Sequence, residues 1–197
     1  MIFRRFSYIL RVLIFSLLSV CFIGTAQAQE TATVTFEAAN RTGGLLTNIA
    51  GDTTKKGFVN VPVGSGNYGY PALTLSNIPL ASLTIGAGYS GGPERSYLVT
   101  PEAGKTVRVE VDTAGVVIGV SSTSNSDGTS KVRVQFAVVD SITFEAVNSV
   151  GAPLSNNGGY VNVSGRYGFP TLGLTNFPLN AVRFGAGYAG LDVAIPA

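Results

Sequence analysis

Long stretches of this 197-residue chain occur twice, and this repetition limits the fold more than any other feature of the sequence. The first match joins VTFEAANRTGGLLTN, from Val34, to ITFEAVNSVGAPLSN, from Ile142. The longest match joins YGYPALTLSNIPLASLTIGAGYSG, from Tyr68, to YGFPTLGLTNFPLNAVRFGAGYAG, from Tyr167, and a short GFVNV and GYVNV pair lies between them. Internal repetition of this kind is typical of a structural unit that occurs more than once. We therefore expect two tandem copies of one small fold.

Apolar and polar residues alternate with a period of two in both copies. Val34 and Phe36 alternate with Thr35, and the same pattern recurs at 107–111, 132–136 and 142–146. Such runs place one face of a β-strand on a core and the other toward water. Glycine, proline and asparagine separate the runs, and after residue 28 no stretch keeps its apolar residues at helical spacing. The pattern predicts an all-β fold, either a sandwich or a barrel.

The order of strands and turns resembles that of carboxypeptidase-regulatory-like and transthyretin-like β-sandwich domains, and of related stalk repeats in bacterial adhesins. The residues that carry the resemblance are NIPL at 77–80 with GY at 88–89, and NFPL at 176–179 with GY at 187–188. The resemblance implies two tandem Ig-like, antiparallel sandwich units that act as spacers, stalks or binding platforms. It also implies a closing strand at 105–111 in the first copy. The second copy has no such strand and is expected to be incomplete.

The first 28 residues have the features of a secretory signal peptide. Three arginines, the last of them Arg11, precede an apolar run at 12–24, and Ala26-Gln27-Ala28 then places small residues at the two positions that a signal peptidase recognises. This combination predicts cleavage before Gln29. A membrane anchor is less favoured, because the uncharged run is shorter than the roughly 20 residues of a spanning helix. We expect a secreted protein, located in the periplasm, at the cell surface or outside the cell, with no membrane span after cleavage.

The mature chain is expected to divide into a first repeat at 29–122 and a second at 123–197. The polar stretch SSTSNSDGTS, at 121–130, is consistent with two interpretations. It could link two domains, or it could be the tip of a hairpin that joins 116–120 to 132–138. Strong strand patterns flank it closely on both sides, which favours the hairpin.

The mature chain lacks the residue types on which most catalysis depends. It contains no histidine, and Cys21 lies within the expected signal peptide. Nucleophilic triads and zinc sites are therefore not expected, and we predict a non-enzymatic protein without a cofactor or metal. Loss of three arginines leaves ten basic and eleven acidic residues, so a nucleic-acid partner is not expected. Glu37 and Glu145 recur in both copies, and the alternation predicts that both face solvent.

Six repeated aromatic residues remain as candidate contacts with a ligand or partner. Aromatic rings supply rigid contact area to sugars and proteins, although they also fill sandwich cores. The favoured function is structural or adhesive, with self-association through an open strand edge or binding to other surface proteins. The alternative is a carbohydrate-binding module that holds a polysaccharide on these rings. The candidate contacts are Tyr68, Tyr70 and Tyr89 in the first copy and Tyr167, Phe169 and Tyr188 in the second.

Overall fold

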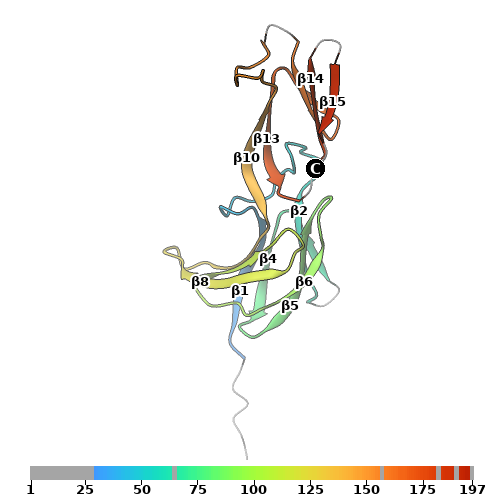
Figure 1. The fold of residues 1–197 in the computed structure, drawn as a ribbon. Helices are drawn as coiled ribbons and strands as arrows, with labels where there is room; N and C mark the ends of the chain where they lie inside the picture. Colours follow the sequence, from blue (N-terminus) through green and yellow to red (C-terminus); the bar gives the residue numbers. More distant parts are fainter. Residues whose placement is uncertain (1–28, 64–65, 156–157, 181–182, 189–190, 196–197) are drawn as a thin grey trace, which may run out of the picture. The chain divides into compact units, whose positions relative to one another are not determined.

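The computed structural model describes residues 29–63, 66–155, 158–180, 183–188 and 191–195, with the backbone alone for the last range. The expected signal peptide lies outside these residues. Residues Thr31–Ala197 form one compact unit. Its regular structure consists of β-strands, and the described residues contain no α-helix (Figure 1). The prediction of an all-β chain is confirmed.

Two sheets make up the first segment, which we define as residues 31–137. One has five strands in the order β4-β1-β9-β7-β8, and the other has four in the order β3-β2-β5-β6. Strand β7 lies where the closing strand was expected. The bounds are β1 (Thr31–Ala39), β2 (Gly57–Val61), β3 (Asn67–Gly69), β4 (Ala72–Pro79), β5 (Leu83–Tyr89), β6 (Arg95–Val99), β7 (Lys105–Val111), β8 (Val117–Ser124) and β9 (Ser130–Gln135).

The second segment, residues 138–195, repeats part of this arrangement. Its four-stranded sheet has the order β12-β11-β14-β15, which corresponds strand for strand to β3-β2-β5-β6. Its other sheet contains only β10 and β13, the counterparts of β1 and β4. Among the described residues, β7, β8 and β9 have no counterpart in it. The bounds are β10 (Val138–Glu145), β11 (Tyr160–Val163), β12 (Arg166–Gly168), β13 (Thr171–Pro178), β14 (Phe184–Tyr188) and β15 (Leu191–Ile195).

The alternation in β1 produces its two faces directly. Val34 and Phe36 are fully buried, whereas Thr35 lies on the outer face and shares a 3.0 Å hydrogen bond with Thr74 of β4. The inward side chains join those of the four-stranded sheet, such as Ile85, in one hydrophobic cluster. Both sheets of the first segment therefore enclose a common core.

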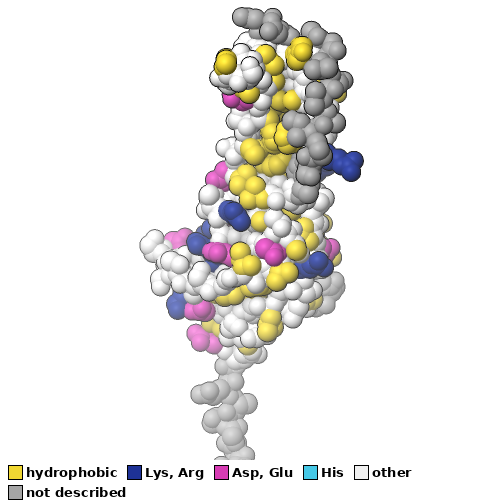
Figure 2. All heavy atoms as spheres, viewed as in Figure 1, with side chains coloured by type: hydrophobic (Ala, Val, Ile, Leu, Met, Phe, Trp, Pro, Cys, Tyr) yellow, Lys and Arg dark blue, Asp and Glu magenta, His cyan; other side chains and the backbone are white. Residues whose placement is uncertain are grey.

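The core of the second segment is smaller. Its cluster has three buried members among the described residues, Val163, Leu174 and Phe177. Phe144 packs against Phe177, with ring centroids 5.5 Å apart, but it is only partly buried. In Figure 2, charged side chains concentrate over the first segment, and the visible face of the second shows hydrophobic side chains at the surface. The missing strands thus leave part of this core uncovered.

The polar stretch at 121–130 is neither a linker nor a hairpin tip. Strand β8 runs through its first half and pairs with β7, and β9 begins at its last residue on the opposite edge of β7. The chain therefore crosses over β7 between these strands, and β9 lies parallel to both β7 and β1. The expected boundary between 122 and 123 falls inside β8. Alternation revealed the strands, but it carries no information about which strands are neighbours.

Candidate functional site

The outer edge of β10 is the main structural difference between the segments. Strand β1 has two neighbours, antiparallel β4 and parallel β9. Strand β10 pairs with β13, matching Ile142 to Leu174 as β1 matches Val34 to Leu75. No described strand lies along the other edge of β10. A strand edge of this kind offers unpaired N–H and C=O groups to an additional strand.

Side chains at equivalent positions of β1 and β10 also differ in their exposure to solvent. Phe36 has an exposed fraction of 0%, whereas Phe144, its counterpart, is half-buried. Val34 is also fully buried, and its counterpart Ile142 is half-buried. These residues have nearly the same sequence neighbours, so the exposure reflects the absence of covering strands rather than a different local pattern.

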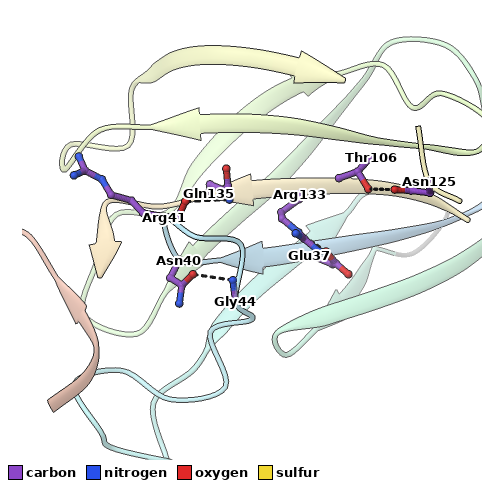
Figure 3. A network of polar contacts seen from close by, with 8 residues as sticks. All are labelled: Glu37, Asn40, Arg41, Gly44, Thr106, Asn125, Arg133 and Gln135. Atoms are coloured by element: carbon purple, nitrogen blue, oxygen red, sulfur yellow. Dashed lines mark hydrogen bonds and ion pairs between the residues drawn. The ribbon is translucent and has the colours of Figure 1, made fainter. Parts of the chain in front are cut away.

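An ion pair holds β9 against β1. Arg133 Nε donates to Glu37 Oε2 at 2.7 Å, and the side chains retain exposed fractions of 21% and 8%. Figure 3 shows the two side chains pointing toward each other from neighbouring strands. The expectation that Glu37 faces solvent is wrong, because β9 brings an arginine over the outer face of β1. Glu145 does face solvent: β13 places Thr171 on one side of it, and no described strand lies along the other edge of β10.

Tyr89 and Tyr188 differ for the same reason. Tyr89 has an exposed fraction of 4%, and its ring meets Phe136, which follows β9, edge to face at a centroid distance of 5.3 Å. Burial raises the pKa of the Tyr89 phenol. Tyr89 is therefore a core residue and leaves the set of candidate surface contacts. Tyr188 is 46% exposed, and the described residues of its segment include no counterpart of Phe136.

Four of the candidate aromatics form two matched clusters on the surface. Tyr68 and Tyr70 stack with centroids 6.4 Å apart and planes 15° apart, and Tyr167 and Phe169 stack at 6.4 Å and 13°. All four rings are well exposed. A third ring completes each cluster, since Phe58 lies 6.2 Å from Tyr70 and Tyr160 lies 6.1 Å from Phe169.

The third ring was missed in the sequence, although a signal for it existed. Phe58 and Tyr160 occupy the same position in the matched GFVNV and GYVNV strands. Strand β2 pairs with β3, which carries Tyr68, and β11 pairs with β12, which carries Tyr167. An aromatic at the same place in both copies, on a neighbouring strand, identifies the cluster once the pairing is known.

Polar contacts connect the loop after β1 to the second segment. Asn40 is buried, and its Nδ2 donates to Asp140 and, at 2.9 Å, to Asn176 Oδ1. The same side chain accepts the Gly44 N–H at 2.8 Å, as Figure 3 shows. The Thr42 hydroxyl also donates to Asp140, at 2.7 Å. These bonds engage the carboxylate of Asp140, near the start of β10.

A cavity of about 340 Å³ lies near this loop. Lys55, Arg166 and Arg183 line it together with Asp52. Arg166 donates to the Ala50 carbonyl, and Lys55 lies 3.7 Å from Asp52. A hydrogen bond from Thr54 lowers the pKa of Asp52. Of these cations, Arg166 connects the loop to the second segment, and Lys55 pairs within the loop.

The described residues contain no cluster of three or more His, Cys, Asp or Glu side chains placed to hold a metal ion. No helix in the same residues is long and apolar enough to cross a membrane. Comparison with family models, with curated proteins and with solved structures finds no match for this chain.

Proposed function

We propose that this is an exported structural or adhesive protein without catalytic activity, built from two tandem β-sandwich units that arose by duplication. In this proposal it assembles with other chains, its own copies or other surface proteins, through the open edge of β10. The observation that carries the proposal is the two-stranded sheet of β10 and β13, which stands where the first segment has five strands. An open edge beside half-buried apolar side chains favours the addition of a strand.

The sequence supports a non-enzymatic role in this proposal. The mature chain has no histidine or cysteine to act as a base or nucleophile. The two repeated carboxylates do not form a pair, because Glu37 is engaged with Arg133 and Glu145 belongs to a different sheet. Low charge and repeated units are common among stalk and spacer domains, which the sequence resembles.

Light scattering coupled to size-exclusion chromatography tests the proposal on residues 29–197. We expect a molar mass above that of the monomer that grows with concentration. Thr143→Lys places a charge on the outer face of β10 and should reduce this growth, because edge lysines oppose strand pairing. Ser149→Lys, in the exposed turn after β10, is the charge-matched control and should leave the growth unchanged. A monomer at every concentration would exclude self-association.

A carbohydrate-binding module is the second candidate function. It is favoured by the two exposed three-ring clusters, in which the stacking geometry of Tyr68 and Tyr70 recurs in Tyr167 and Phe169. Sugar rings bind to such exposed aromatic faces. Retention on immobilised polysaccharides should fall when Tyr68→Ala and Tyr167→Ala are combined, and Leu98→Ala, at another exposed apolar position, is the control. Unchanged retention would remove this candidate.

A further inference from the structure

The first segment shows what kind of strand completes a β10-type edge. Along β1, the neighbour is β9, which runs parallel and places Val132 beside Phe36, Arg133 beside Glu37 and Val134 beside Ala38. Gln135 and Phe136 follow, and Phe136 covers the ring of Tyr89. The edge of β1 is therefore paired with a strand whose direction and sequence pattern are both defined.

Four of the residues that contact β9 or the following Phe136 have counterparts of the same type in the second segment. Phe144 and Ala146 are the counterparts of Phe36 and Ala38, Glu145 is the counterpart of Glu37, and Tyr188 is the counterpart of Tyr89. Three of these four residues are more exposed than their counterparts, namely Phe144, Glu145 and Tyr188. The second segment therefore presents a complete set of contacts for a β9-like strand, without the strand.

We propose that the edge of β10 binds, in parallel orientation, a strand of another polypeptide with the pattern apolar–basic–apolar–polar–aromatic. The basic residue pairs with Glu145, the first apolar residue lies beside Phe144, and the aromatic residue covers Tyr188. This inference rests on the proposed function, because it assumes that the β10 edge is used for assembly.

The described part of the chain supplies no free strand of this type. The pattern VRV occurs in β7 and in β9, and each of these strands already has a neighbour on both edges. If β9 left β1 and paired with β10, one strand pairing would be lost for each one gained, so the exchange brings no net pairing. The described strands are therefore excluded as the source, and the proposal takes the strand from a different polypeptide.

Pairing of β10 with β10 of a second copy satisfies fewer of these contacts. The sequence of β10, VVDSITFE, contains two acidic residues and no basic one. A second β10 thus brings no cation to Glu145, and like charges placed opposite each other are unfavourable. The outer edge of β13 is a weaker candidate, because its counterpart β4 also ends its sheet and is open in the first segment. Self-pairing is then the weaker mode, and a β9-like strand displaces it.

The chain itself provides the probe for a direct test. A fluorescent peptide with the sequence of residues 129–137, TSKVRVQFA, is titrated into the mature protein, residues 29–197, and fluorescence anisotropy is recorded. We expect saturable binding of one peptide per chain. A peptide with glutamate in place of Arg133 should bind at least about tenfold more weakly, because it places two acids side by side. Glu145→Lys in the protein should restore its binding.

Cross-linking gives the position and direction of the bound peptide. The mature chain has no cysteine, so Thr143→Cys introduces a single thiol beside the edge. In the register of β1 and β9, where Thr35 lies beside Lys131, a parallel peptide forms a disulfide with Thr143→Cys through a cysteine that replaces Lys131. An antiparallel peptide with the same charge pair would link through a cysteine that replaces Gln135.

The outcomes separate the inference from the proposed function. Binding with charge exchange and a Lys131-position cross-link supports the inference, even if the protein alone is a monomer and self-association is excluded. If the protein does self-associate, the peptide should convert it to a one-to-one complex. Absence of binding, equal binding of a scrambled peptide, or a cross-link at the Gln135 position would overturn the inference. Circular dichroism of Glu145→Lys verifies folding, and Glu145→Gln should weaken binding of the unaltered peptide without a reversal of charge.

Discussion

Strands β1 and β10 occupy matched places in the repeat and differ in their surroundings. VTFEAAN at 34–40 corresponds to ITFEAVN at 142–148, and both strands pair with a matched antiparallel strand in the same register. Strand β1 lies inside a five-stranded sheet, whereas β10 lies at the edge of a two-stranded sheet. The comparison shows that the burial of a side chain is set by the neighbours that the topology provides, even when the local pattern is unchanged.

The largest difference is expected from the two phenylalanines that point into the cores. Phe36→Ala should reduce the free energy of unfolding by about 3–5 kcal/mol, because the side chain is fully buried. Phe144→Ala should cost about half as much, because its side chain is already partly exposed to water. Urea denaturation of both variants measures the difference. Equal losses would show that the second core is as well covered as the first.

A smaller difference is expected from the two matched glutamates. Glu37→Gln leaves Arg133 beside a neutral side chain and should reduce the free energy of unfolding by about 1–2 kcal/mol. This loss is smaller than that for a fully buried ion pair, because Arg133 keeps contact with water. Glu145→Gln should change the stability by no more than about 0.5 kcal/mol, as is usual for exposed positions. Chemical denaturation at low ionic strength is the measurement. A large loss for Glu145→Gln would mean that this carboxylate already has a partner.

The backbone of the two strands should also differ in hydrogen exchange. Amides that bond to β9 are protected in β1, and the matched amides on the outer edge of β10 face solvent. We expect these β10 amides to exchange at least about tenfold faster. Exchange measured by mass spectrometry with peptides that separate the two strands provides the test. Binding of the β9 peptide should slow exchange in β10 and leave β1 unchanged.

A further small effect at neutral pH is expected at Tyr97 of β6. Its hydroxyl donates to the Gly115 carbonyl at 3.3 Å, so Tyr97→Phe should cost about 0.5–1 kcal/mol. Desolvation by burial raises the pKa of Tyr97 from 10.0 to about 12. The folded state therefore holds this proton more tightly, and stability is lost as the pH rises from 10 to about 12.

The two segments also differ at the position of Tyr97. Its position in the register of β5 and β6 is taken by Ile195 in the register of β14 and β15. Alkaline destabilisation from this residue should therefore start in the first segment. Denaturation followed between pH 9 and 12 should show a weaker pH dependence in Tyr97→Phe, and an identical pH dependence would contradict the assignment.

The sequence predicted the strands well and their neighbours poorly. Alternation at 107–111 and 132–136 located β7 and most of β9, because burial of one strand face leaves a visible period of two. The same alternation could not show that β9 inserts between β1 and β7, since side-chain pattern does not encode strand order. The unexpected burial of Glu37 follows from that one insertion.

The exposed aromatic residues were predicted only in part. Repetition identified Tyr68 and Tyr167 as members of exposed clusters, and it could not distinguish them from Tyr89, which has the same repetition and is buried. The distinction depends on Phe136, a residue outside the matched sequences. The open edge was anticipated from the missing closing strand, but the proposed parallel geometry and charge requirement depend on the position of β9 beside β1, which the sequence did not predict.

The parallel position of β9 also has a consequence for the order of folding. Glu37 and Arg133 are 96 residues apart in the chain, so β1 cannot gain its second neighbour until almost all of the first segment has been made. Contacts of such long sequence separation slow folding, because a large loop must close before they form. During that interval nascent β1 exposes the same edge that β10 keeps in the finished protein. A β9-like strand from another polypeptide would then meet the edge of β1 first, and the edge of β10 only after β10 has followed β9 in synthesis.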